Sequence, residues 1–141
     1  YDPLIETNKE ISKDVKSTSL ENLLQDSHAI SIHVHLTKET ANLIDDKELS
    51  MMKKNSVLIN LSRGGIVNEV ALYKALISNH LSGAAFDVFE NEPSNTEEFT
   101  SNLIELKNFF STPHIAGTSE QAIRKLGESA INCLMEKYQN N

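Results

Sequence analysis

The sequence lacks several features that mark specialised classes of protein. Cys133 is its only cysteine, so a disulfide framework within the chain is excluded and a reducing compartment is expected. The apolar neighbours Ile131, Leu134 and Met135 predict that Cys133 is a buried helical thiol rather than a nucleophile. No apolar run reaches the roughly 18 residues of a membrane-spanning helix and no signal peptide is recognisable, so the predicted location is the cytoplasm.

Positive charge is also in short supply. The chain has 13 Lys and Arg against 20 Asp and Glu, a formal net charge of −7. A surface with this balance repels polyphosphates, so neither nucleic acid nor an anionic membrane is an expected partner. A small acidic substrate stays open, because a local arginine decides its binding. With 141 residues, 39% hydrophobic and 23% charged, the composition is that of one ordinary globular domain.

Short apolar, β-branched runs alternate with helical stretches along the chain. This alternation predicts an α/β fold whose parallel sheet is covered by helices on both faces. The predicted strands comprise residues 29–36, 56–61, 83–89 and 108–112, with residues 15–17 as a short fifth candidate. In a sheet of this kind, the loops at the carboxyl ends of the strands bind ligands.

Capping residues predict where the helices begin. The sequences TSLE at 18–21 and DDKE at 45–48 have the pattern of capping boxes. Asn68 can cap a helix over residues 69–78, and TSEQ at 118–121 opens the last helix. The apolar residues of that last helix are expected on one side; they are Ile123, Leu126, Ala130, Cys133 and Leu134.

Three of the predicted strands are followed by residues that could take part in catalysis or ligand binding. Arg63 comes after the second and precedes two glycines, which let backbone approach a ligand closely. Asp87 and Glu92 lie at the end of the third strand and just after it, and His114 follows the fourth. Each has a plainer explanation: a surface charge for Arg63, turn or loop residues for Glu92 and His114. Together they predict a cleft at one edge of the sheet.

The three residue types suit one kind of reaction. A carboxylate beside a histidine fixes the tautomer of the imidazole and prepares it to accept an alcohol proton. An arginine supplies a two-pronged grip for a carboxylate. The sequence therefore favours chemistry on a small hydroxy acid.

Four successive segments resemble the signature segments of the D-2-hydroxyacid dehydrogenase family. They are HVHLTKETANLIDDKELSMMKKNSVLIN, NLSRGGIVNEVALYKAL, GAAFDVFENEP and STPHIAGTSEQA. The resemblance covers essentially the whole chain, and its wording is nearest to phosphoglycerate or glycerate dehydrogenases. It implies an NAD-dependent oxidoreductase that interconverts a D-2-hydroxy acid and a 2-keto acid by hydride transfer.

The resemblance also implies a role for each of these residues. Arg63 matches the arginine that holds the substrate carboxylate, His114 matches the acid–base residue, and Glu92 matches the carboxylate paired with it. Asp87 matches an aspartate near the nicotinamide. Relatives that oxidise formate typically have Gln at the position of Glu92, so hydroxy acids are favoured over formate.

For the cofactor, the resemblance implies NAD. Asp2 matches the acidic residue that bonds the adenosine ribose, and an aspartate there repels a 2′-phosphate, so NAD is favoured over NADP. The remaining positions that match cofactor contacts are His33, Val34, His35, Thr40, Leu61, Ser62, Arg63, Asp87, His114, Ala116 and Gly117. His35, His28 and Asn68 depart from the family's usual Pro, Asp and Asp. No metal site is expected, because nothing completes a ligand set around the histidines.

The resemblance further implies that a segment is missing before residue 1. The ribose-binding acid lies about 20 residues after the glycine-rich turn of a dinucleotide fold, and here it is Asp2. Residues 1–141 are thus expected to be the carboxyl-terminal portion of a partial Rossmann-like, doubly wound domain. The first strand, the glycine loop, the first helix and the substrate domain would be absent, and strand 29–36 would have an unpaired edge. The isolated chain is expected to be inactive, and the longer parent a homodimer.

Two other interpretations stay open. C-terminal-binding-protein corepressors share the fold and the same Arg, Glu and His, and act mainly through NAD-dependent assembly, so an NAD-sensing binding module is the alternative. A non-catalytic structural fragment would describe the isolated chain but not its ancestor.

Overall fold

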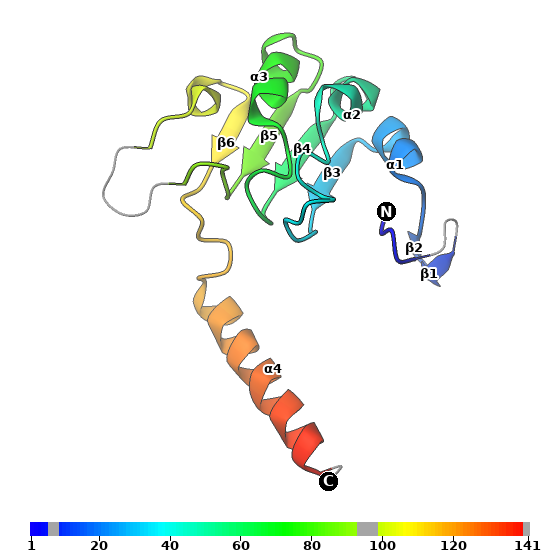
Figure 1. Ribbon diagram of the computed structural model, residues 1–141, viewed down its shortest axis with the longest axis vertical. Coiled ribbons are helices and arrows are strands. Elements are labelled where there is room, and N and C mark those ends of the chain that lie inside the picture. Colours follow the sequence, from blue (N-terminus) through cyan, green and yellow to red (C-terminus); the bar gives the residue numbers. More distant parts are fainter. Residues whose placement is uncertain (6–8, 93–98, 140–141) are drawn as a thin grey trace.

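The computed structural model describes residues 1–5, 9–92 and 99–139. Its centre is a parallel sheet of four strands in the order β3-β4-β5-β6, namely Ala29–Ile32, Val57–Asn60, Gly83–Phe86 and Phe109–Ser111 (Figure 1). The strands pair in register, so that Ile30, Leu58, Ala84 and Phe109 form one row across the sheet. The predicted α/β fold with a parallel sheet is confirmed.

Three α-helices and a 3-10 helix cover one face of this sheet. They are α1 (Leu20–Asp26), α2 (Asp46–Met51), α3 (Glu69–Ile77) and η1 (Asn102–Glu105). Leu24, Leu49, Leu72 and Leu103, one from each helix, are at most 2% exposed and share a single apolar core with the sheet. Burial of this surface, at roughly 25 cal/mol per Å², is the main force that fixes the strands and therefore the loops at their ends.

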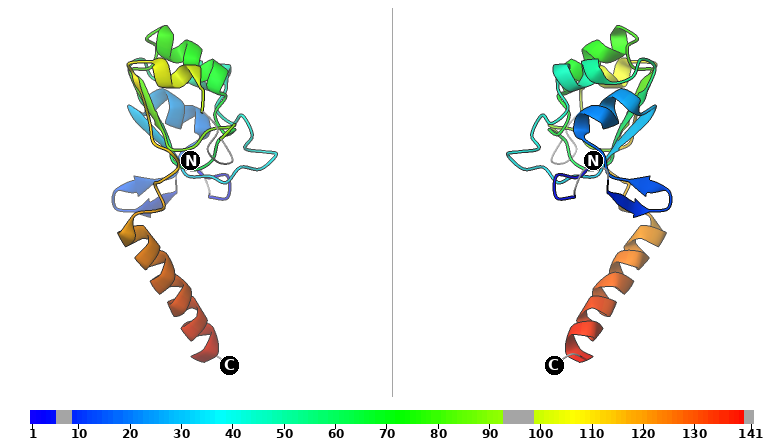
Figure 2. Two further views of the ribbon diagram at one scale, coloured as in Figure 1. Left: turned by 90° about the vertical axis from the view of Figure 1, so that its left-hand side faces the viewer. Right: turned by 90° about the vertical axis from the view of Figure 1, so that its right-hand side faces the viewer.

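The expectation that helices cover both faces of the sheet is not met by the described residues, since the second face is partly exposed. Along β4 and β5 buried residues alternate with partly exposed ones, and Phe110 of β6 is 67% exposed. Figure 2 shows α1, α2 and α3 on the same side of the strands. The apolar residues of the strands predict that both faces are covered, but they do not show which part of the chain covers each face.

The strands are shorter than predicted. Residues 33–36, 56, 61, 87–89, 108 and 112 belong to the predicted strands but lie outside the observed ones. At the carboxyl edge, the amides of Asp87 and Thr112 still donate to the last residues of the neighbouring strands, Asn60 of β4 and Phe86 of β5. The fifth candidate is also different: β2 (Val15–Lys16) pairs antiparallel with β1 (Glu10–Ser12) in a separate hairpin. Within the described residues, β3 pairs only with β4, as predicted for an edge strand.

The helix caps agree with the sequence in two cases and differ in two. Asp45 and Glu48 form the predicted capping box of α2, and Asn68 accepts the amides of Val70 and Ala71 at the start of α3. The cap of α1 is Ser19, whose hydroxyl accepts the amide of Asn22, and not Thr18. Likewise Ser119, one residue after Thr118, accepts the amide of Ala122 at the start of the last helix. A neighbouring hydroxyl residue satisfies the same orphan amides, so the pattern alone places a cap to within one residue.

The last helix, α4 (Glu120–Gln139), extends away from the sheet in Figures 1 and 2. Its predicted apolar side is exposed, with Ile123 at 58% and Leu134 at 59%. Cys133 is exposed too, which corrects the prediction of a buried thiol; the helix has the apolar stripe, but no described element packs on it. None of the helices in the described part of the chain is long and apolar enough to cross a membrane.

Candidate active site

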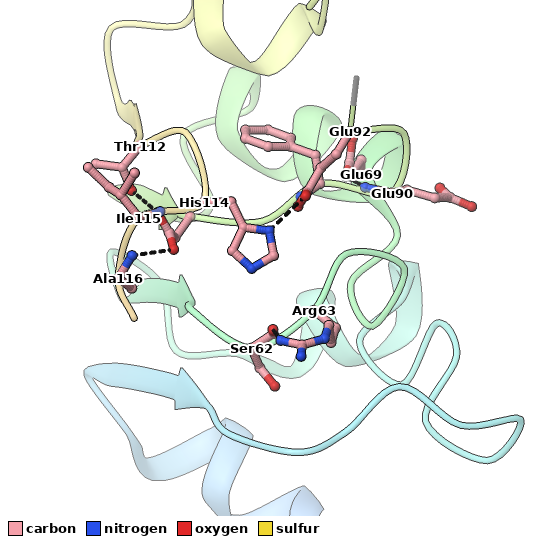
Figure 3. A network of polar contacts seen from close by, with 11 residues as sticks. Ser62, Arg63, Glu69, Glu90, Glu92, Thr112, His114, Ile115 and Ala116 are labelled. Carbon is pink, nitrogen blue, oxygen red and sulfur yellow. Dashed lines mark hydrogen bonds and ion pairs between the residues drawn. The ribbon is translucent and has the colours of Figure 1, made fainter. Parts of the chain in front are cut away.

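The loops that follow β4, β5 and β6 meet at one edge of the sheet. They carry Arg63, Glu92 and His114, the three residues predicted to act together (Figure 3). The strands are parallel and in register, so their carboxyl ends lie side by side and side chains from distant parts of the sequence converge there. The structure therefore brings the three predicted residues into one region.

His114 and Glu92 form a bonded pair. The Nδ1 of the imidazole lies 2.7 Å from Glu92 Oε2, and the side chains are 48% and 34% exposed. The other oxygen of Glu92, Oε1, accepts the backbone N–H of Phe89 at 2.9 Å. The carboxylate is thus held at both oxygens, and it fixes Nδ1 as the bonded nitrogen. This leaves Nε2, which points toward the Ser62–Arg63 loop in Figure 3.

The loop that carries His114 is fastened by Asp87. Asp87 Oδ1 accepts the hydroxyl of Thr112 at 2.5 Å and the amide of Ile115 at 2.8 Å, and Oδ2 accepts the amide of Ala116 at 2.8 Å. Burial alone would raise the pKa of Asp87, but these hydrogen bonds and the nearby His114 together hold the pKa below its usual value. Asp87 is 1% exposed, and both oxygens of its carboxylate accept hydrogen bonds from the loop that carries His114.

His114 itself has a backbone conformation that needs support. Its φ is 52°, in the left-handed region that side chains with a Cβ seldom adopt. Such a conformation costs roughly 1–2 kcal/mol, and it persists when surrounding bonds fix it. The two amides held by Asp87 directly follow His114 in the chain, so the same carboxylate that anchors the loop stabilises this conformation.

Arg63 stands on a loop held from below by Asn60. Asn60 is fully buried at the end of β4; its Nδ2 donates to the carbonyl of Arg63 at 2.9 Å and its Oδ1 accepts the amide of Ser62 at 3.1 Å. The guanidinium is exposed, and its Nη1 donates to the carbonyl of Ser62 at 2.7 Å. Figure 3 shows it across from the His114 ring. A carboxylate bound there would lie between a cation and an imidazole.

Gly64 brings the Arg63 loop against the Glu92 loop. A Cβ on Gly64 would lie 2.0 Å from the carbonyl oxygen of Phe89 and 2.5 Å from the amide nitrogen of Glu90. Only glycine permits this approach. The two loops are therefore in direct backbone contact, and the glycine predicted to let backbone approach a ligand lets one loop approach another.

The residues predicted to contact the cofactor lie mainly along the same edge. Ser62 donates its hydroxyl to the carbonyl of Val34, and Thr40 donates to the carbonyl of His35 at 2.6 Å. His33 bonds back to Ser31 at 2.8 Å. Asp2 accepts the amide of Leu4 near the amino terminus. Leu61 follows β4, and Ala116 and Gly117 follow His114.

Most residues after β3 and β4 and in the turn after β6 are exposed, so a nicotinamide could reach this edge. The five glycines of the sequence do not form the glycine-rich motif that binds the pyrophosphate of a dinucleotide. Among the described residues, no group of three or more His, Cys, Asp and Glu side chains could hold a metal ion.

A pocket of about 400 Å³ opens beside the His114–Glu92 pair. Its walls combine the polar groups of the site with aromatic rings; they are Asp87, Phe89, Glu92, Phe99, Ser111, Thr112, Pro113 and His114. The rings of Phe89 and Phe99 are tilted by 58° to each other, with centroids 4.6 Å apart. The pair thus faces a pocket with an apolar wall on one side.

Sequence reasoning missed two residues of this region, Asn60 and Glu69. Asn60 is a lone amide in the apolar run VLIN, and this interruption was the available signal. Glu69 bonds the amide of Glu90 at 2.8 Å, and nothing in the sequence around it points to that partner.

Comparison with known proteins gives the site a family. Residues 1–116 match the family described as D-isomer specific 2-hydroxyacid dehydrogenase, NAD binding domain. The D-3-phosphoglycerate dehydrogenase of Escherichia coli is 45% identical over 123 residues, 86% of this chain and 30% of that protein. The glyoxylate reductase of Thermococcus litoralis is 47% identical over 108 residues, 77% of this chain and 31% of that protein.

A solved structure is similar over almost the whole chain. It is the NAD-dependent formate dehydrogenase from Staphylococcus aureus in complex with NAD, 37% identical with a TM-score of 0.76, covering 99% of this chain and 40% of that one. The chain thus spans about a third of the length of the relatives named here. Because the family match extends over residues 1–116, the chain belongs to the D-isomer specific 2-hydroxyacid dehydrogenase family.

Proposed function

We propose that the site works in the reversible oxidation of a D-2-hydroxy acid to a 2-keto acid, with NAD as the redox partner. NAD supplies the hydride-accepting ring. The observation that supports the proposal is the bonded pair of His114 and Glu92, 2.7 Å apart, facing the loop of Arg63 across one sheet edge. A carboxylate anchor and a proton acceptor are the two protein groups that this reaction needs.

Each residue then has a defined task. Arg63 binds the substrate carboxylate through its guanidinium. His114 takes the hydroxyl proton at Nε2 during oxidation and returns it during reduction, because Nδ1 is occupied by Glu92. Glu92 keeps the ring in this tautomer and balances the charge that His114 gains. A glutamate at this place, and not an uncharged glutamine, favours hydroxy acids over formate.

The activity of a complete enzyme requires more than these residues. The chain spans 30% of the Escherichia coli dehydrogenase and carries no glycine-rich phosphate turn. We therefore treat residues 1–141 as the carboxyl-terminal portion of a dinucleotide-binding domain, and the isolated chain as inactive. Asp2 would select NAD over NADP by repelling a 2′-phosphate.

A chimera tests the proposed roles. In it, the chain replaces the matching segment of the Escherichia coli D-3-phosphoglycerate dehydrogenase, which is 45% identical. His114→Ala should lower kcat by roughly two to four orders of magnitude, and Arg63→Ala should mainly raise KM for the acid substrate. Arg124→Ala is the matched control, because Arg124 pairs with Glu128 on α4. Full turnover in the His114 variant would remove that residue from the mechanism.

A further inference from the structure

Glu69 is tied to the catalytic loops although it belongs to no predicted site. It lies in the first turn of α3, and its Oε1 accepts the backbone N–H of Glu90 at 2.8 Å. Glu90 adjoins Phe89, whose own amide is bonded to Glu92. Two consecutive amides of this loop are therefore held by glutamate side chains, one of which contacts His114.

The peptide that joins Phe89 and Glu90 has a second close contact, with Gly64. Gly64, next to Arg63, is in backbone contact with Phe89 and Glu90, at a distance that leaves no room for a Cβ. Figure 3 shows Glu69 and Glu90 beside Glu92, on the side of the site away from Thr112. The Glu69 bond and the Gly64 contact thus hold one peptide of the Glu92 loop between α3 and the loop of Arg63.

The bond is not explained by the needs of α3. Asn68 already caps this helix by accepting the amides of Val70 and Ala71. The carboxylate of Glu69 is also disfavoured where it stands: burial raises its pKa, the Glu90 amide lowers it, and the charges of Glu90 and Glu92 raise it further. The bond from the Glu90 amide is the one interaction among these that favours the charged carboxylate.

We propose that Glu69 is a positioning residue, whose grip on the Glu90 amide holds Glu92 against His114 and sets their distance from Arg63. The proposal rests on the proposed function only for its effect on turnover. The effect on the geometry of His114 stands by itself. Glu69 touches neither substrate nor cofactor in this assignment.

Three variants separate the hydrogen bond from the charge. Glu69→Ala removes the acceptor, Glu69→Gln keeps an acceptor without the charge, and Glu69→Asp keeps the charge on a shorter side chain. Glu48→Ala is the matched control, because Glu48 is also a first-turn glutamate that accepts a backbone amide, that of Asp45, but in α2.

The first measurement needs no activity. Nitrogen-15 spectra of the imidazole in the chain report the fraction of His114 with its proton on Nδ1, and hydrogen exchange reports the Glu90 amide. Glu69→Ala and Glu69→Asp should speed exchange at Glu90 by about tenfold, the worth of one hydrogen bond, and reduce the Nδ1–H fraction. Glu69→Gln and Glu48→Ala should leave both at the level of the unaltered chain.

The second measurement uses the chimera. Glu69→Ala should lower kcat by about tenfold with little change in KM for NADH, and Glu69→Gln should restore most of it. Wild-type His114 spectra in Glu69→Ala would overturn the proposal, as would a Glu69→Gln variant as impaired as Glu69→Ala. If Glu69→Ala fails to fold, Glu69→Asp gives the same test. An inactive chimera with the expected spectra would count against the proposed function and leave the positioning role supported.

Discussion

Asp87→Asn is the substitution that best tests how the His114 loop is held. The change keeps the shape of the side chain and one oxygen. That oxygen can still accept from Thr112 and Ile115, as Oδ1 does now. The new amide group, however, faces the N–H of Ala116, which Oδ2 now accepts, so a hydrogen bond becomes a contact between two donors.

The magnitude follows from these three contacts. Hydrogen bonds to a charged acceptor contribute roughly 1.5–3 kcal/mol each, and those to a neutral one about half of that. Two bonds are weakened and one is lost, while relief from burying a charge offsets part of the loss. We expect a net destabilisation of about 2 kcal/mol, a large fraction of the roughly 5–15 kcal/mol that stabilises a domain.

Urea unfolding of the chain at neutral pH, followed by circular dichroism, measures this difference. The control is Asp46→Asn: Asp46 and Lys74 are 65% and 60% exposed and 3.4 Å apart, so its loss should stay below about 1 kcal/mol. The pKa of Asp87 is lowered in the folded chain, so its contribution is present above the unfolded pKa and is lost as pH falls through the folded one. The gap between wild type and Asp87→Asn should therefore narrow in acid. An Asp87→Asn variant no less stable than Asp46→Asn would refute the idea that Asp87 holds the His114 loop.

Three further predictions concern the loops, the charge of Glu69 and the cofactor. Gly64→Ala should displace the Glu92 loop and lower kcat of the chimera by at least tenfold, whereas Gly127→Ala, with nothing within 4 Å of its added Cβ, should leave kcat unchanged. The pKa of Glu69 is raised in the fold, so its contribution to stability is lost as pH rises through the folded pKa. The free energy of unfolding in urea of Glu69→Gln should therefore increase relative to that of the wild type between acid and neutral pH. Fluorescence titration of the isolated chain with NADH should show no micromolar binding, and such binding would contradict the need for a glycine-rich turn.

The sequence predicts the edge of the sheet well because that edge depends on spacing. Arg63, Glu92 and His114 each follow an apolar strand, and parallel strands in register place their carboxyl ends together. What covers each face is less accessible. The stripe on α4 predicted a buried Cys133, yet the thiol is exposed, because an apolar stripe shows that a helix has a side to bury without showing what it packs on.

Sequence reasoning missed Asn60 and Glu69, and it named Asp87 without its hydrogen-bond partners. These three side chains bond to backbone groups, and a residue's letter does not show which distant backbone amide its side chain will reach. The amide that Glu69 holds lies 21 residues away, and those that Asp87 holds lie 28 and 29 residues away. Only the fold brings these distant groups within reach. The sequence segments that resemble the family therefore identify the residues that can react. The positions of those residues depend on other side chains, whose hydrogen-bond partners become known only from the fold.

Asn60 and Asp87 show how the sheet passes its order to the site. Both are buried and polar, at 0% and 1% exposure, and both stand where a strand ends. A buried polar group must find partners, and each finds them in the loop beyond its own strand or its neighbour: Asn60 in Ser62 and Arg63, Asp87 in the loop of His114. The rigid core thus fixes the polar group, and the polar group fixes the loop. Apolar residues at these two places would pack as well in the core, but they would leave the guanidinium and the imidazole without a defined separation.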